Sequence, residues 1–157
     1  MPTPGIIIDK PLSLSSSLKD EAIDLIVTGG QVKYGDARTG VYRAELLAIY
    51  QENNQIIATA CFKNPRNSYI ERVFSLAKVP ELMEGFNYEL GYIVTRDGFE
   101  GRHICQQLLN GLFPQIKTHS MFATTRKPAM LHILEKLGFE KCGEVYNEEI
   151  RLLVFNV

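Results

Sequence analysis

The chain has 157 residues, of which 45% are hydrophobic and 22% are charged, and its formal net charge is -1. This length suits one domain with one core and is short for two, so we expect a single domain covering residues 1–157. A nearly neutral charge gives no overall electrostatic attraction to nucleic acid or to an anionic membrane. Neither is therefore an expected partner.

The three cysteines, Cys61, Cys105 and Cys142, stand far apart, with no CxxC pair and no histidine at ligand spacing. Such a pattern favours reduced thiols over a disulfide or a zinc site. The first residues, MPTPGIIIDKPL, have a short apolar run and no basic region, so they do not resemble a signal peptide. No apolar run approaches membrane-spanning length. We therefore expect a cytoplasmic protein that binds no metal.

The beginning of the chain predicts a strand followed by a helix. A β-branched run at Ile6 to Ile8 is typical of a strand, and apolar residues from Leu14 to Ile26 fall on one helical face. Serines before this helix and Gly29-Gly30 after it are the expected end signals. Ser16 and Lys19 also form the S-x-x-K pattern of penicillin-binding proteins. No partner motif accompanies it, so N-capping serines are the better interpretation.

The next segment predicts a loop, a hairpin and a second helix. Gln31 to Arg43 is polar and rich in Gly and Asp, which indicates a loop or irregular crossing that could border a substrate cleft. Ala44 to Tyr50 and Gln55 to Lys63 are strand-like runs that we expect to pair in the middle of the sheet. Ser68-x-x-Glu71 reads as a capping box that starts a helix near Ser68. Pro80 to Gly85 is expected to form a short turn or one helical turn.

The last part of the chain predicts a strand, a helix and a closing hairpin. Met121 to Thr125 is the strand, and Met130 to Leu137 carries the apolar spacing of a helix that ends at Gly138. Phe139 to Tyr146 and Ile150 to Phe155 form the hairpin. The whole order of elements indicates a mixed α/β sheet with helices packed on it.

The central stretch, Glu89 to Leu109, runs from an apolar strand through a glycine-containing loop into an amphipathic helix. Backbone N–H groups at a helix start have no intrahelical acceptor, and the helix dipole adds partial positive charge there. Gly101 allows a phosphate to approach closely, and Arg102 and His103 can add side-chain donors. This stretch therefore predicts an anion site, behind which the helix packs through Ile104, Leu108, Leu109 and Leu112.

The same stretch resembles the acyl-CoA loop of the GNAT superfamily of acetyl-CoA-dependent N-acetyltransferases, whose pattern is Q/R-x-x-G-x-G/A. In this sequence Gly101 matches an adjacent glycine commonly seen there. Three positions of the pattern are substituted, namely Glu100 at the Q/R, His103 at the G and Cys105 at the G/A.

Two flanking segments support the resemblance. Tyr88 to Val94 resembles the fourth strand of the family, and Ala129 to Phe139 resembles a later helix that ends in Gly-Phe. The order of elements also matches over nearly the whole chain. The resemblance implies an α/β (α+β) fold with a mixed, mostly antiparallel sheet of six to seven strands and about four helices. It also implies a splay between the fourth and fifth strands.

The resemblance implies acetyl-CoA as the cosubstrate. Its pantetheine would pair with the fourth strand, and its pyrophosphate would lie on the amides of the loop and helix start. The loss of glycine at His103 and Cys105 is tolerable because a helix start has ordinary φ and ψ angles. Cys105 is read as a small apolar filler, with an acyl-carrier role as the alternative. Arg126 and Lys127 are cofactor contacts or solvated charges. The cofactor-binding residues expected are Ile93, Val94, Thr95, Gly101, Arg102, His103, Ile104, Cys105, Gln106, Arg126 and Lys127.

The implied reaction is direct attack of a primary amine on the acetyl thioester within a ternary complex. It needs proximity, a base, donors for the oxyanion and an acid for the thiolate. Glu89 is the candidate base, with a structural carboxylate as the alternative. Leu134 stands at the usual tyrosine position of the family and cannot donate a proton. The remaining candidate acids are Tyr146, which we rank first, Tyr92, His132 and His103.

Three functions remain open at this stage. The first is an N-acetyltransferase that acts on a primary amine of a small molecule or a protein. The second is a catalytically weak or inactive acyl-CoA-binding regulatory module, which Leu134 and the altered loop favour. The third is a protein–protein adaptor that kept only the fold. The sequence carries no recognisable code for the amine acceptor. A homodimer through an edge strand is compatible with the predicted sheet.

Overall fold

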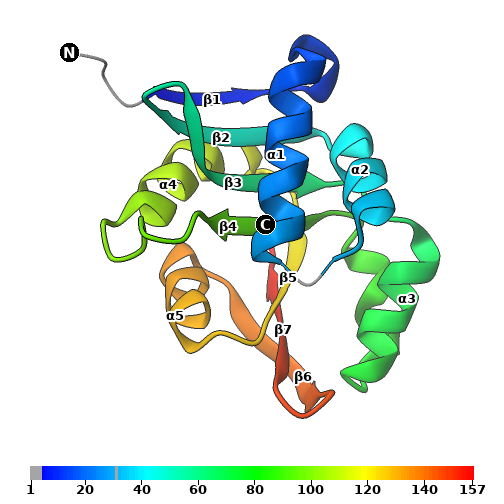
Figure 1. Cartoon of the computed structure of the whole chain (residues 1–157). Helices are drawn as coiled ribbons and strands as arrows, with labels where there is room; N and C mark the ends of the chain where they lie inside the picture. Colours follow the sequence, from blue (N-terminus) through cyan, green and yellow to red (C-terminus); the bar gives the residue numbers. More distant parts are fainter. Residues whose placement is uncertain (1–4, 31) are drawn as a thin grey trace. The chain divides into compact units, whose positions relative to one another are not determined.

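The structure is a computed structural model that describes residues 5–30 and 32–157 (Figure 1). Its strands are β1 (Gly5–Asp9), β2 (Leu46–Glu52), β3 (Gln55–Lys63), β4 (Glu89–Thr95), β5 (Met121–Thr125), β6 (Glu140–Tyr146) and β7 (Ile150–Phe155). Its α-helices are α1 (Ser16–Gly29), α2 (Tyr34–Arg43), α3 (Asn67–Leu76), α4 (Ile104–Ile116) and α5 (Pro128–Leu137). Two 3-10 helices are η1 (Pro11–Ser13) and η2 (Pro80–Gly85).

The strands form one mixed sheet in the order β1-β2-β3-β4-β5-β7-β6. Neighbouring strands are antiparallel in the pairs β1 with β2, β2 with β3, β5 with β7 and β6 with β7, whereas β4 and β5 run parallel. The expected mixed, mostly antiparallel sheet of six to seven strands is confirmed. The described residues contain five α-helices where about four were expected. None of the described helices is long and apolar enough to cross a membrane.

The chain divides into two compact units. The first comprises Met1–Lys63 with Gly91–Ile116, and the second comprises Asn64–Leu90 with Lys117–Val157. Strand β4 contributes its first two residues to the second unit and its remainder to the first. The expectation of a single domain stays a prediction.

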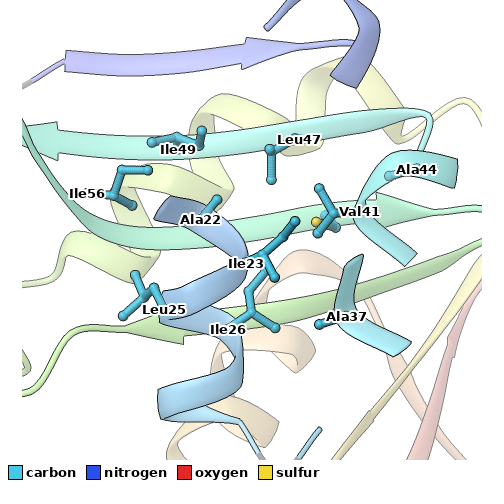
Figure 2. Close-up of a cluster of buried hydrophobic side chains, with 11 residues drawn as sticks. Ala22, Ile23, Leu25, Ile26, Ala37, Val41, Ala44, Leu47, Ile49 and Ile56 are labelled. Carbon is cyan, nitrogen blue, oxygen red and sulfur yellow. The ribbon is translucent and has the colours of Figure 1, made fainter. Parts of the chain in front are cut away.

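The core of the first unit lies between its helices α1 and α2 and one face of β2 and β3 (Figure 2). Figure 2 shows side chains from these four elements pointing toward one another. The apolar spacing predicted for α1 is what produces this face, since every third or fourth residue of the helix meets the sheet. The fully buried members from α1 are Ala22, Ile23 and Ile26, with Ala37 and Val41 from α2 and Leu47, Ile49, Ile56 and Cys61 from the strands.

Helix α4 covers the opposite face of the same strands. A Cβ placed on Gly111 of α4 would meet the side chains of Ile6 and Ile8 on β1. Ile6 and Ile8 pair with Tyr50 and Ala48 of β2, while the neighbouring Ile49 belongs to the core under α1. Because side chains alternate along a strand, the two sets point to different faces. The predicted packing residues of this helix, Ile104, Leu108, Leu109 and Leu112, are all buried.

The second unit has its own core between α3 and strands β5, β6 and β7. Phe74 of α3 is fully buried and lies edge-on to Phe122 of β5 and stacked on Phe86. Helix α5 ends at Gly138, whose φ of 106° is the left-handed conformation expected of a C-terminal glycine. Other buried members of this core are Ile70, Val73, Ala77, Cys142, Leu152 and Val154.

The start of α1 confirms the capping interpretation of the serines. The hydroxyl oxygen of Ser15 accepts a hydrogen bond of 3.1 Å from the amide of Leu18, so Ser15 is the N-cap. Lys19 is 6% exposed, and its ammonium lies 4.6 Å from the centre of the Tyr42 ring. The cap is therefore Ser15, which directly precedes Ser16 of the S-x-x-K pattern, and Lys19 of that pattern is a cation held against an aromatic face.

Two local predictions are wrong. The segment predicted as a loop over Gln31 to Arg43 contains α2, although Gln31 itself lies outside the described residues. Ala37 and Val41, four residues apart, bury one face of this helix and outweigh its two glycines. The predicted capping box does not form, because the N-cap of α3 is Arg66, two residues before Ser68, and its side chain makes no cap bond.

Candidate functional site

Strand β4 carries a backbone irregularity at Tyr92. The φ angle of Tyr92 is 49°, a left-handed value that is uncommon for residues other than glycine. The hydroxyl of Thr59 on β3, which is fully buried, donates a hydrogen bond of 2.8 Å to the carbonyl oxygen of Tyr92. A side chain therefore satisfies a carbonyl that is turned out of the regular strand geometry.

The side chain of Tyr92 joins β4 to α2. Its hydroxyl donates a long hydrogen bond of 3.4 Å to the carbonyl oxygen of Asp36. A Cβ on Gly40 would overlap this hydroxyl, so α2 approaches the tyrosine where it has no side chain. The ammonium of Lys63 lies 4.1 Å from the centre of the Tyr92 ring. The irregular residue is thus held from both its backbone and its ring.

The residues expected to pair with a pantetheine, Ile93 to Thr95, come directly after Tyr92 in β4. Val94 packs against the core of the first unit, as Tyr92 does, so the alternation of β4 places Ile93 and Thr95 on its other face. Arg96 then ties the end of the strand to β3. Its amide donates to the carbonyl of Ile57 at 2.7 Å and its Nε to that of Ile56 at 2.8 Å.

The loop between β4 and α4 contains three residues with positive φ, namely Gly98 at 89°, Gly101 at 81° and His103 at 60°. The expectation of ordinary backbone angles is wrong for His103, which stands just before the helix. It holds for Cys105, which lies inside α4. His103 occupies the first glycine position of the acyl-CoA pattern. The structure keeps this histidine in a conformation that glycine adopts freely.

The first helical hydrogen bond of α4 runs from the amide of Gln107 to the carbonyl of His103 at 3.0 Å. The amides of Ile104, Cys105 and Gln106 lie ahead of this bond, where a helix has donors but no intrahelical acceptors. The Nδ1 of His103 lies 3.2 Å from Oε1 of Gln106. The helix start therefore offers a set of N–H groups, together with the positive end of the helix dipole, to an anion.

Arg102, expected as a phosphate contact, is engaged with the chain itself. Its guanidinium donates to the carboxylate of Glu52, with Nη2 to Oε2 at 3.0 Å, and it lies 5.4 Å from the centre of the Phe99 ring. The Arg102 side chain is 48% exposed, so the ion pair is largely solvated. A ligand anion at this loop would compete with Glu52 for the arginine.

In the second unit, the candidate base Glu89 is buried, with 3% of its surface exposed. The hydroxyl of Tyr69 on α3 donates a hydrogen bond of 3.1 Å to Oε2 of Glu89. Glu89 is also the β4 residue that pairs with Phe122 of β5, and the amide of Phe122 donates to the carbonyl of Tyr88 at 3.0 Å. The start of β4 therefore fixes the backbone of Glu89, and Tyr69 fixes its carboxylate.

Tyr146, the candidate acid, is electrostatically coupled to the same carboxylate. Burial and the negative charge of Glu89 raise the pKa of Tyr146 from 10.0 to about 12, and the positive charge of Arg72 opposes them. The structure thus brings together the two predicted catalytic residues. Tyr146 is protonated at neutral pH, as a proton donor must be.

Sequence reasoning missed Tyr69 and Arg72, which complete this cluster. Both lie on α3, three residues apart, and the guanidinium carbon of Arg72 is 5.4 Å from the centre of the Tyr69 ring. Their spacing places them on one face of the helix, and this was the only signal in the sequence. Nothing local to α3 indicated a partner twenty residues further along the chain.

The other residues singled out in the sequence lie outside this cluster of Glu89, Tyr146, Tyr69 and Arg72. Leu134 is 1% exposed and belongs to the interior, and His132 is exposed on α5. Arg126 lies 3.7 Å from Glu149, and the amide of Lys127 donates to the hydroxyl of Thr125 at 3.1 Å. None of the three cysteines forms a disulfide within the described residues; Cys105 is half-buried and the other two are buried.

Comparison with solved structures finds the same fold in several proteins. Escherichia coli ElaA has a TM-score of 0.74 and 13% identity, covering 98% of this chain and 100% of its own. An acyl-CoA N-acyltransferase from Pseudomonas aeruginosa has a TM-score of 0.72 and 12% identity, with coverage of 98% and 100%. A GNAT-family acetyltransferase from Streptococcus agalactiae has a TM-score of 0.65 and 18% identity, with coverage of 98% and 96%.

At these identities the likeness shows the fold alone, which is that of GNAT acetyltransferases. Neither the known family models nor the curated proteins contain a match to the sequence.

Proposed function

We propose that the protein is an N-acyltransferase that moves an acetyl group from acetyl-CoA to a primary amine. The shared fold supports acyl transfer as the general chemistry. Two features of the chain support the finer proposal. One is the donor-rich loop between β4 and α4, and the other is the buried Glu89 with its tyrosines. Fold likeness by itself would not identify a reaction.

The observation that carries the proposal is the left-handed backbone of His103, with a φ of 60°. A histidine in this conformation is strained by about 1–2 kcal/mol relative to an ordinary one. It is retained at the position where the acyl-CoA pattern has glycine. The loop therefore keeps a left-handed residue just ahead of α4, although the glycine that adopts this conformation easily has been replaced.

Acetyl-CoA supplies the acetyl thioester, and the first unit is proposed to hold it. The amides of Ile104, Cys105 and Gln106 would donate hydrogen bonds to the pyrophosphate, and the loop residues Gly101 to His103 would lie beside it. Arg102 would turn from Glu52 to a phosphate. The backbone of Ile93 to Thr95 would pair with the pantetheine. Arg126 and Lys127 are proposed as further contacts of acetyl-CoA.

The second unit is proposed to handle the protons. Glu89 accepts the proton that the attacking amine loses, and the hydroxyl of Tyr69 holds Oε2 of that carboxylate in place. Tyr146 donates a hydrogen bond, and then a proton, to the departing thiolate. When Glu89 becomes protonated, the charge that raises the pKa of Tyr146 disappears, so the tyrosine becomes a stronger acid as the amine reacts.

The test is release of free thiol from acetyl-CoA across a panel of primary amines, with calorimetric binding of acetyl-CoA and of CoA measured in parallel. Glu89→Gln and Tyr146→Phe should each reduce kcat by about 10²–10⁴-fold, the range for loss of a proton-transfer group. Matched controls are Glu84→Gln and Tyr34→Phe, which change exposed residues and should keep full activity. Failure to bind either nucleotide would refute the proposal.

A second candidate function is acyl-CoA binding without turnover. The observation that favours it is Leu134, which fills the interior at the position where the family often has its proton donor. Tight binding of acetyl-CoA, with no thiol release for any amine and no effect of Tyr146→Phe, would support this function over catalysis.

A further inference from the structure

Arg72 is the cationic end of a short chain of contacts that begins at the buried carboxylate. Tyr69 donates its hydroxyl to Glu89 at 3.1 Å. The guanidinium of Arg72 lies over the ring of the same tyrosine, with 5.4 Å from its central carbon to the ring centre. Stacking on an aromatic face fixes a guanidinium and leaves the N–H groups at its edge available.

The two charges flank one hydroxyl. Glu89 and Arg72 act on Tyr146 with opposite sign, so both lie within electrostatic reach of its phenol oxygen. The carboxylate is 3% exposed, whereas Arg72 is exposed. The buried negative charge and the exposed positive charge are therefore linked through Tyr69, which contacts both residues.

Arg38 also lies over a tyrosine ring, that of Tyr42 in the first unit, while three other arginines are engaged with acceptors of the chain. Arg102 pairs with Glu52, Arg126 pairs with Glu149, and Arg151 donates to the carbonyl of Gly143 at 2.8 Å. Within residues 5–30 and 32–157, Arg72 makes no ion pair with a carboxylate of the chain. Its planar set of donors is thus open to a carboxylate from outside.

We propose that Arg72 binds a carboxylate of the acceptor, and that the acceptor is a small molecule carrying both a primary amine and a carboxylate. The amine lies toward Glu89 and Tyr69, and the carboxylate meets the edge of the guanidinium. A polyamine would bring a second positive charge to Arg72 and is disfavoured. This inference rests on the proposed function, because it names the acceptor class of the same reaction.

The experiment compares amino acids with the corresponding amino-acid amides, which share the amine and side chain and lack the carboxylate charge. Rates are compared per neutral amine, since an amide lowers the pKa of its neighbouring amine. A charge-assisted hydrogen bond predicts a kcat/KM about 10- to 100-fold higher for the acid. The difference should appear in KM, because Arg72 binds the acceptor and does not transfer the proton.

Arg72→Gln should remove the preference for the acid over the amide, and any effect through the pKa of Tyr146 should act on both acceptors alike. Arg72→Lys should restore part of it, since lysine keeps the charge without the planar donor pair. Arg66→Gln, which changes another exposed arginine at the start of α3, is the matched control and should behave as the unchanged protein does.

The outcomes separate this inference from the proposed function. Thiol release with equal rates for acids and amides, or an acid preference that survives in Arg72→Gln, overturns the role of Arg72 and leaves acyl transfer standing. If acetyl-CoA binds without turnover, calorimetry on the CoA-loaded protein compares the affinities for the acid and for the amide. Tighter binding of the acid supports the inference, and equal affinities overturn it. Absence of both nucleotide binding and turnover overturns both proposals.

Discussion

The hydroxyl of Thr59 on β3 donates a 2.8 Å hydrogen bond to the carbonyl oxygen of Tyr92 on β4. Tyr92 is in a left-handed conformation, and Thr59 is completely buried. A buried carbonyl without a partner costs about 1–3 kcal/mol, so this hydroxyl stabilises the irregular geometry of the strand. The position of Ile93 to Thr95, the proposed pantetheine-pairing residues, therefore depends on a threonine outside the loop.

Thr59→Val should lower the free energy of unfolding by about 1–2 kcal/mol, since it keeps the shape of the side chain and removes the donor. It should also shift the backbone amide resonances of Tyr92 and Ile93. Thr59→Ser keeps the hydroxyl and should lose about 1 kcal/mol with the methyl group, leaving those resonances in place. Urea unfolding and NMR spectra distinguish the two. Unshifted resonances in Thr59→Val would refute this role.

The raised pKa of Tyr146 predicts a loss of stability at high pH. The folded protein holds the phenol proton up to about pH 12, while the unfolded chain releases it near pH 10.0. The stabilising effect of this group is therefore complete below pH 10 and declines as pH rises toward 12. The free energy of unfolding, measured between pH 10 and pH 12, should fall less steeply with pH in Tyr146→Phe than in the unchanged protein.

Glu89→Gln should lower the pKa of Tyr146, because it removes one of the two causes of the shift. The measurement is the ultraviolet absorbance of the phenolate, taken as the difference between each protein and its Tyr146→Phe counterpart. Arg72→Gln should move the pKa in the opposite direction. An unchanged titration in both variants would contradict the electrostatic coupling on which the proposed proton transfer depends.

His103→Gly should raise the free energy of unfolding by about 0.5–1 kcal/mol. Glycine removes about 1–2 kcal/mol of left-handed strain and loses part of this gain to its freer unfolded chain. His103→Val should lower stability by at least about 1 kcal/mol, because a β-branched residue fits this conformation poorly. Urea unfolding of the two variants checks the prediction, which fails if valine is tolerated as well as glycine.

Glu52→Gln should free Arg102 and strengthen the binding of CoA by roughly two- to fivefold, the range expected for a solvated ion pair. Its effect on stability should stay within about 0.5 kcal/mol. Calorimetric titration with CoA gives the affinity. Glu45→Gln, at an exposed glutamate of the same unit, is the control. Weaker binding in Glu52→Gln would mean that Arg102 does not serve a phosphate.

Strong local patterns predicted most of the fold correctly. The apolar face of α1, the glycine that ends α5 and the alternating strands of the closing hairpin each carry their signal within a few residues. Helix α2 was missed because only Ala37 and Val41 of its residues are buried, and two glycines in ten residues argue against a helix. Its packing against α1 and Tyr92 decided the outcome, and no local pattern reports such packing.

The sequence could propose candidate site residues but could not predict all of their surroundings. The loop residues could be placed because a resemblance assigns them positions, but the pattern could not tell that His103 would keep the backbone of the lost glycine. Tyr69 and Arg72 could not be predicted, since their relation to Glu89 joins α3 to β4 and depends on the tertiary fold. The capping box at Ser68 failed because the helix begins two residues earlier than that box requires, which makes Arg66 the N-cap.

Helix α2 has two glycines with unequal freedom. A Cβ on Gly35 would meet nothing within 4 Å, whereas one on Gly40 would overlap the Tyr92 hydroxyl. Each glycine weakens the helix by about 0.5–1 kcal/mol relative to alanine, so α2 is expected to open locally more often than α1. Its opening would release the ring that steadies the irregular strand. Evolution or design can change how often this happens through Gly35, because only that glycine has space for a side chain.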